Sequence, residues 1–401
     1  MLSLMYPQVM RIVSELSVGL YPFTAKADSI PKLIVKVSKE VILTAKVRQG
    51  FSIYLIPYEH QGFNSLGFLA AFFDDERHPY TAGGVFVKEI GGRELSRLFV
   101  SPQIDVHFFD ELGREYLAYR AEVKFTKEHR ELLKRSVIPS IQGLNQSVLV
   151  GYLKEWFSRS GEDEDAAAIK VNFLEPLMVE DLIIFDMRED LHTYKGSSGF
   201  TALTLERDEP GTPQEKEIIT LLQRTFEADQ IYWAPRRTYD NEEMVDVLVV
   251  TSSSVFLIQA KDSPNLEETL DLSIEKKRSA TNRALKKGLR QVSGALGYLR
   301  RSSPFIVLME GEQVMIDVAD KKVYGLVVVR ELFDFDYDDY TPPMLNFYND
   351  KQVPCIPLSY SELHQYTKNI DNEQGFLEAI MKVFNHGVET GMFPRLRMHP
   401  P

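Results

Sequence analysis

The stretch from Met244 to Asp262, MVDVLVVTSSSVFLIQAKD, constrains the fold of this chain more than any other stretch. Two runs rich in Val, Ile, Leu and Phe flank a cluster of Thr and Ser, which is the pattern of a β-hairpin buried on both faces. Asp246, Gln259 and Lys261 lie inside these apolar runs. An unpaired polar or charged group in a core is strongly unfavourable, so the three side chains need a shared reason to be there.

Hairpin geometry supplies that reason. If Thr251 to Ser254 form the turn, the numbers of paired residues sum to about 505, which sets Asp246 opposite Gln259. Lys261 lies two residues beyond Gln259 and shares its face. A slip of one residue would move Asp246 to the other face, so the prediction depends on this register.

A carboxylate, an amide oxygen and an ammonium would then meet at one place on an apolar sheet. The carboxylate of Asp246 and a carbonyl oxygen can hold a hard divalent cation such as Mg²⁺. Lys261 can orient or help deprotonate an attacking water and offset phosphate charge. The alternative is a structural ion pair between Asp246 and Lys261 at a strand end, with Gln259 bonded to a loop. Asp262 faces away from Lys261 by strand alternation.

These residues resemble the PD-(D/E)xK nuclease superfamily. Within it, they resemble the branch in which Gln replaces the acidic residue before x-Lys, as in Mrr-like restriction endonucleases and nuclease-related (NERD-type) domains. In that family an aspartate ends or interrupts one core strand, Q-x-K lies on the next, and a glutamate comes from a preceding helix. Asp246 and Gln259-Ala260-Lys261 match the first two features. The segment from Gln214 to Leu222 resembles the family's F-E-x-x-x-x-x-L-L helix, with Gln214 where Phe is usual. The resemblance covers about residues 205 to 330.

Glu215 is the third candidate. On a helix from Thr212 to Glu227, positions 215, 218, 219, 222 and 226 form one stripe, so Glu215 starts the core-facing side while Glu217 points elsewhere. The alternative is that Glu215 merely occupies the first turn, where the helix dipole favours an acidic residue.

The resemblance implies a metal-dependent DNA endonuclease that hydrolyses phosphodiester bonds, in restriction, repair or antiphage defence. It implies that the catalytic residues are Glu215, Asp246, Gln259 and Lys261. It also implies that Mg²⁺, which Mn²⁺ can replace, is bound by Glu215, Asp246, the Gln259 side chain and the Ala260 carbonyl. Two alternatives stay open. One is a catalytically inactive DNA-binding or regulatory module with the same fold, and the other is a protein-interacting scaffold.

The stretch from Lys276 to Arg301 contains nine Lys or Arg and no Asp or Glu, in a chain of net charge −12. A solvated helix face normally mixes signs, so this stretch is a predicted phosphate-binding helix. The predicted DNA-binding residues are Lys276, Lys277, Arg278, Arg283, Lys286, Lys287 and Arg290. The alternative is a basic face that docks onto acidic segments of the chain. Glycines 288, 294 and 297 of this stretch are expected to allow close helix packing.

The 401 residues are enough for two domains, and the composition shifts near residue 200. The pattern predicts an α+β domain over 1–200, followed over 201–401 by an α/β restriction-endonuclease-like domain, a mixed central sheet flanked by helices. The role of residues 1–200 is open among sensing, target recognition and homo-oligomerisation. The single cysteine, Cys355, excludes an intrachain disulfide and a Cys-based zinc cluster. No apolar run reaches the length of about 18 residues that spans a bilayer, so a cytoplasmic protein without membrane contact is expected.

Several other segments carry predictions that the structure tests. Residues 104–123 read as a hairpin with its turn at 110–113, and residues 41–47 read as a strand. The acidic runs 161–165 and 334–340 are expected to be loops. A helix is expected from about Ile274 to Arg301, and Ser359 with Glu362 forms a capping box that opens another.

Overall fold

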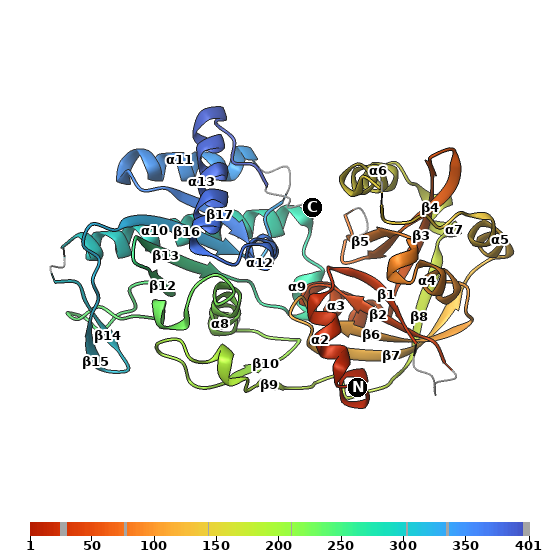
Figure 1. The fold of residues 1–401 in the computed structure, drawn as a ribbon, viewed down its shortest axis with the longest axis horizontal. Coiled ribbons are helices and arrows are strands. Elements are labelled where there is room, and N and C mark those ends of the chain that lie inside the picture. Colours follow the sequence, from red (N-terminus) through yellow and green to blue (C-terminus); the bar gives the residue numbers. More distant parts are fainter. Residues whose placement is uncertain are drawn as a thin grey trace. The chain divides into compact units, whose positions relative to one another are not determined.

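The computed structural model describes residues 1–24, 30–75, 78–142, 144–209, 211–301, 304–333 and 337–395. By its packing the chain divides into two compact units. Unit 1 comprises residues 1–182 and 265–271, and unit 2 comprises residues 183–264 and 272–401. The chain is mixed α and β in both (Figure 1). No helix in the described ranges is long and apolar enough to cross a membrane.

The centre of unit 1 is a mixed sheet whose strand order, among described residues, is β1-β2-β6-β7-β8-β3-β4-β5. Its strands are β1 (Gly19–Phe23), β2 (Lys32–Lys36), β3 (Gly50–His60), β4 (Phe63–Phe72), β5 (Tyr80–Val85), β6 (Gln103–Phe109), β7 (Glu115–Lys124) and β8 (Ile169–Pro176). Its helices are α1 (Leu2–Met5), α2 (Gln8–Glu15), α3 (Lys39–Arg48), α4 (Gly92–Leu98), α5 (Lys127–Arg135), α6 (Gln146–Ser158), α7 (Glu162–Ala167) and α9 (Glu267–Leu270), with the short 3-10 turn η1 (Lys88–Ile90). The hairpin predicted over 104–123 is confirmed as β6 and β7.

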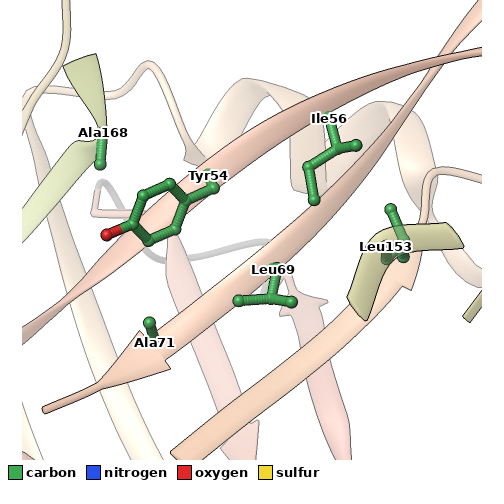
Figure 2. Close-up of a cluster of buried hydrophobic side chains, with 6 residues drawn as sticks. All are labelled: Tyr54, Ile56, Leu69, Ala71, Leu153 and Ala168. Carbon is green, nitrogen blue, oxygen red and sulfur yellow. The ribbon is translucent and has the colours of Figure 1, made fainter. Parts of the chain in front are cut away.

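One part of the unit 1 core lies between β3, β4 and α6. Figure 2 shows Tyr54 and Ile56 of β3, Leu69 and Ala71 of β4, Leu153 of α6, and Ala168 beside β8 packed together. Gly67 of β4 lets the helix come this close, since a β-carbon there would lie 2.5 Å from Leu153 Cδ2. Trp156 of α6 packs against the same cluster.

Two predictions in this unit are wrong. Residues 41–47 form the middle of helix α3, where residues 41–45 are all buried. A short apolar run buried on every side carries no periodicity that separates a helix from a strand. The acidic run 161–165 is not a loop, because it forms most of α7, which Gly161 N opens by donating to Glu164 Oε2.

The main sheet of unit 2 has, in the described residues, the order β11-β12-β13-β16-β17. The first two pairings are antiparallel and the last two are parallel. Its strands are β11 (Ile231–Trp233), β12 (Val247–Val250), β13 (Ser254–Lys261), β16 (Lys322–Val329) and β17 (Cys355–Ser359). Smaller strands are β9 (Ile184–Asp186), β10 (Thr201–Leu203), β14 (Ile306–Met309) and β15 (Glu312–Met315). The helices are α8 (Gly211–Leu222), α10 (Ile274–Arg301), α11 (Tyr337–Lys351), α12 (Tyr360–Asn369) and α13 (Glu373–Thr390), with η2 (Glu189–Leu191) and η3 (Ala228–Gln230).

Helices cover both faces of this sheet. Helix α10 lies along β13 and β16 (Figure 1), and a β-carbon at Gly288 would lie 2.5 Å from Val327 Cγ1 and 3.5 Å from Lys261 Cγ. Phe226, which follows α8, packs at 5.3 Å, between ring centroids, on Phe256 of the opposite face. The two faces therefore separate odd-numbered residues of β13, beneath α10, from even-numbered ones, on the α8 side.

The helix predicted from Ile274 to Arg301 is confirmed, as is the capping box of Ser359 and Glu362. The acidic loop predicted at 334–340 lies partly outside the described residues, and its end, from Tyr337, is helical. Close packing explains Gly288, but a β-carbon at Gly294 or Gly297 would meet nothing within 4 Å, so that prediction is wrong for both. A division into compact units does not test independent folding, so the domains 1–200 and 201–401 stay a prediction.

Candidate functional site

The hairpin register places the three predicted polar residues together. Val247 pairs with Ile258 and Val250 with Val255, which is the register that sets Asp246 opposite Gln259. Asp246 directly precedes β12, and its backbone carbonyl accepts a hydrogen bond of 2.9 Å from Ala234 N. Asp246 and Gln259 are buried, and the side chain of Lys261 is 14% exposed. Lys261 and Asp246 therefore share a side of the sheet, as predicted.

Lys261 is the centre of a hydrogen-bonded group. Its Nζ donates to Asp246 Oδ2 at 3.1 Å, to Gln259 Oε1 at 2.9 Å and to Ala260 O at 2.7 Å. Asp246 Oδ2 also accepts a bond of 2.7 Å from Ala260 N. These contacts satisfy the buried carboxylate and the amide oxygen at once. Three of the oxygens assigned to a metal ion thus converge on one cation, the lysine ammonium.

Glu215 lies near this group without being hydrogen-bonded into it. Its Oε2 accepts a hydrogen bond of 2.8 Å from Trp233 Nε1, at the end of β11. Burial raises the pKa of Glu215; the Trp233 bond opposes this rise, and the charge of Asp246 adds to it. Glu215 also interacts electrostatically with Lys261. The structure therefore brings Glu215 within electrostatic range of Asp246 and Lys261.

Glu243 is a member of the site that the sequence did not reveal. Its side chain hydrogen bonds with Asp246, and desolvation together with that bond raises the pKa of Glu243 to about 8. The residue precedes β12 in a non-strand segment and is itself exposed. Strand alternation cannot reveal it, because it lies before β12.

The prediction for Asp262 is confirmed, and the prediction for Glu217 is confirmed in part. Asp262 faces away from Lys261, and its carboxylate pairs with Arg207 at 2.9 Å and Arg330 at 3.3 Å. Glu217 does point away from the candidate site, but it is buried, 3.7 Å from Arg207. A second group of charged residues therefore lies on the face of the sheet opposite to Lys261, and it consists of Arg207, Glu217, Asp262 and Arg330.

The basic helix is α10, and its inner side packs beside Lys261 through Gly288. Exposed side chains on this helix include Lys276, Arg283, Lys286, Lys287 and Arg290. Lys277 and Arg278 are half-buried and have interactions of their own. Five of the seven predicted DNA-binding residues are therefore exposed.

The donor set at this place consists of oxygens, which suits a hard cation such as Mg²⁺. Among the described residues no three His, Cys, Asp or Glu side chains form a group that could hold a metal ion as they stand. A cation here would therefore need the amide oxygen of Gln259 and the carbonyl of Ala260 besides carboxylates. The assignment of Glu215, Asp246, Gln259 and Ala260 as ligands stays a prediction.

No protein-family model, curated protein or solved structure matches this chain. The resemblance to PD-(D/E)xK nucleases therefore depends on the motif residues themselves and on how they are arranged.

Proposed function

We propose that unit 2 is a metal-dependent deoxyribonuclease, a phosphodiester hydrolase of the PD-(D/E)xK kind. The observation that carries the proposal is the convergence of Asp246, Gln259 and Ala260 oxygens on Lys261 Nζ at the end of a buried hairpin. Helix α8, hairpin β12 to β13 and basic helix α10 follow one another in the order that the resemblance implies. A purely structural hydrogen-bonded network would explain Asp246, Gln259 and Lys261 but not the basic helix beside them.

Each residue of the proposed site has its own role. Asp246 and Glu215 supply carboxylate oxygens for Mg²⁺ or Mn²⁺, and the Gln259 side chain and the Ala260 carbonyl complete the set. When bound, the ion lowers the pKa of water and offsets charge on the phosphate. Lys261 can only donate hydrogen bonds, because an ammonium has no acceptor, and its three donors are directed at Asp246, Gln259 and Ala260. With a bound ion on these oxygens, Lys261 would be available to position the attacking water and a phosphate oxygen. Trp233 holds Glu215 in place through the bond from Nε1.

DNA is the proposed substrate because the exposed charged side chains of α10 from Lys276 onward are all positive. Arg283, Lys286, Lys287 and Arg290 are exposed along a helix that contacts the sheet beside Lys261. Such side chains bind the phosphate backbone and carry no base information, so specificity would come from elsewhere in the chain. Restriction, repair or antiphage defence is the setting that the resemblance implies, and the cytoplasm is the proposed compartment. Unit 1 would serve in sensing, target recognition or homo-oligomerisation.

A second candidate is a DNA-binding or regulatory module that keeps the site without cleaving. Two observations favour it. Gln259 contributes no negative charge, and Lys261 already makes three hydrogen bonds to the oxygens that a metal ion would use. In that case the ammonium would be the permanent cation of the site.

Cleavage of supercoiled plasmid and of single-stranded circular DNA with Mg²⁺ or Mn²⁺ separates the two candidates. For the nuclease we expect cleavage by the full chain and a loss of at least about 100-fold in Lys261→Ala, the size of effect that removal of a positioning and charge-stabilising group gives. Lys382→Ala is the matched control, since Lys382 is an exposed lysine on helix α13. Salt-dependent DNA binding with no cleavage under either metal would instead support the inactive module, and absence of both would reject DNA as the ligand.

A further inference from the structure

The two-stranded sheet of β9 and β10 in unit 2 has one covered face and one uncovered face. Its strands pair Phe185 with Ala202 and Asp186 with Thr201. Thr201 and Leu203 are buried on the side where helix α8 contacts β10 (Figure 1). By strand alternation, Phe185 and Ala202 lie on the opposite side, which α8 does not cover.

The uncovered side is apolar and carries two exposed aromatic rings. Phe185 is 58% exposed, and Phe200, which directly precedes β10, is 43% exposed. Their ring centroids lie 6.3 Å apart. Ile183 and Met187 flank Phe185 on the same side by alternation, and both are exposed. These four residues, Ile183, Phe185, Met187 and Phe200, are called the aromatic face.

Lys216 of α8 connects the aromatic face to the candidate site. Its Nζ lies 5.8 Å from the ring centroid of Phe200 and 4.8 Å from that of Trp233. The same atom donates to Ser198 Oγ at 2.8 Å and to Phe200 O at 3.2 Å, so its position is fixed. Trp233 in turn donates to Glu215 Oε2. The aromatic face therefore continues, through one ammonium and one indole, to a carboxylate of the proposed site.

Lys216 also gives this place a positive charge. Its hydrogen bonds go to a hydroxyl and a backbone carbonyl, and within the described ranges it forms no salt bridge with a carboxylate. Exposed rings beside a cation are the combination that binds a single strand of nucleic acid, because bases stack on the rings while the cation contacts the phosphate. A purely apolar protein partner would require neither the pair of rings nor the ammonium.

We propose that the aromatic face binds unpaired bases of DNA. Phe185 and Phe200 stack on the bases, and Lys216 contacts the phosphate of the same strand. The inference rests on the proposed function, because it takes DNA as the ligand and Glu215 as part of the site. It adds the substrate class, which is DNA with unpaired bases next to the scissile phosphate. Every base has a π face, so this surface accepts any sequence.

Fluorescence anisotropy with the full chain and labelled DNA tests the proposal, in EDTA so that no DNA is cleaved. The probes are a thymidine oligonucleotide, the same oligonucleotide with central abasic positions, a fully paired duplex, and a duplex with a central unpaired segment. Tight binding of the last probe would identify opened duplex as a source of the bases. Tight binding of the thymidine oligonucleotide alone would identify free single strands.

We expect Phe185→Ala and Phe200→Ala each to weaken binding of the thymidine oligonucleotide by about five-fold or more, the effect of losing one stacked base. The ratio of oligonucleotide to duplex affinity should fall by the same factor. The abasic oligonucleotide should bind wild type and Phe185→Ala equally, because the ring then has no base to stack on. Phe63→Ala is the matched control, since Phe63 of β4 is also 58% exposed. Lys216→Gln should lower the slope of log affinity against log salt by about 0.7, the value for one phosphate contact on a single strand.

Equal oligonucleotide affinity in the wild type and both phenylalanine variants, or equal losses for oligonucleotide and paired duplex, would overturn the proposal. Absence of oligonucleotide binding by the wild type would do the same. A wild-type dimer that dissociates in Phe185→Ala, seen by sedimentation, would assign the face to a second copy of the chain instead. Recovery of binding in Phe185→Trp supports the proposal, because it shows that the ring is the group required.

The two proposals fail separately. Single-strand binding that depends on Phe185 and Phe200, without cleavage under either metal, rejects the nuclease and keeps the aromatic face as a DNA-binding surface. Metal-dependent cleavage by a chain whose preference for unpaired bases does not depend on these two rings rejects the aromatic face and keeps the nuclease.

Discussion

Glu243 keeps its proton at pH values at which an ordinary glutamate has lost it. Desolvation and the neighbouring Asp246 carboxylate raise its pKa to about 8 in the folded protein, whereas an unperturbed glutamate titrates near about 4.3. Between these two values the folded state binds more protons at this residue than the unfolded state does. The free energy of unfolding therefore falls as the pH rises through this window, and below it the protonation of Glu243 causes no further change of stability with pH.

This sign gives a prediction for the metal-free protein. The free energy of unfolding of Glu243→Gln should equal that of the wild type at about pH 5 and be larger at about pH 9. The reason is that the amide cannot ionise and can still donate to Asp246. Urea unfolding in the presence of a chelator at both pH values measures the difference. Glu242→Gln provides the baseline for removing a charge nearby. A wild-type advantage that grows with pH would show that Glu243 is stabilised as an anion, contrary to this reasoning.

At the scale of elements, the packing of α10 on the sheet fixes where Lys261 lies. A β-carbon at Gly288 would lie 2.5 Å from Val327 Cγ1, so Gly288→Ala must push α10 away from β16 or displace Val327. Gly294, in the same helix, has open space where its β-carbon would be. The two glycines therefore form a natural pair of test and control.

We expect Gly288→Ala to lower the free energy of unfolding by about 1 to 3 kcal/mol, the usual effect of overpacking. Gly294→Ala should raise it by up to about 1 kcal/mol, because alanine is the better helix former in a helix interior. Urea denaturation followed by circular dichroism measures both. Stabilisation by both substitutions would mean that α10 does not pack closely on β16 at Gly288.

The sequence was sufficient for the hairpin and insufficient for what surrounds it. The register of β12 with β13 could be predicted because the polar turn and the apolar runs leave one pairing that sets Asp246 beside Gln259 and Lys261. Glu243 could not be found in this way, because it lies before the strand, where no periodicity fixes a side-chain direction. Helix α3 cannot be distinguished from a strand by its sequence, for a related reason. Its apolar run is buried all round, and tertiary contacts decide between helix and strand there.

At the scale of the whole molecule, the chain passes between the two compact units more than once. Residues 265–271 belong to unit 1 although they lie in sequence between β13 and α10 of unit 2. Helix α9 in this segment contacts α3, and Arg48 Nη2 of α3 bonds Asp271 Oδ1 at 2.8 Å. A single domain boundary in the sequence cannot describe this arrangement, because residues 265–271 pack in unit 1 although the segments on both sides of them belong to unit 2.

Leu270 tests the assignment of this segment, since it is buried in unit 1 and follows β13 by nine residues in the sequence. Leu270→Ala should destabilise unit 1 by about 2 to 4 kcal/mol, through lost burial and the cavity that remains. The two tryptophans report on the units separately, because Trp156 lies in unit 1 and Trp233 in unit 2. In a Trp233→Phe background the urea midpoint of Trp156 fluorescence should fall strongly on adding Leu270→Ala, while in a Trp156→Phe background the midpoint of Trp233 should move less. The opposite order of shifts would assign α9 to the stability of unit 2, and would make the segment after Lys261 part of the scaffold of the candidate site.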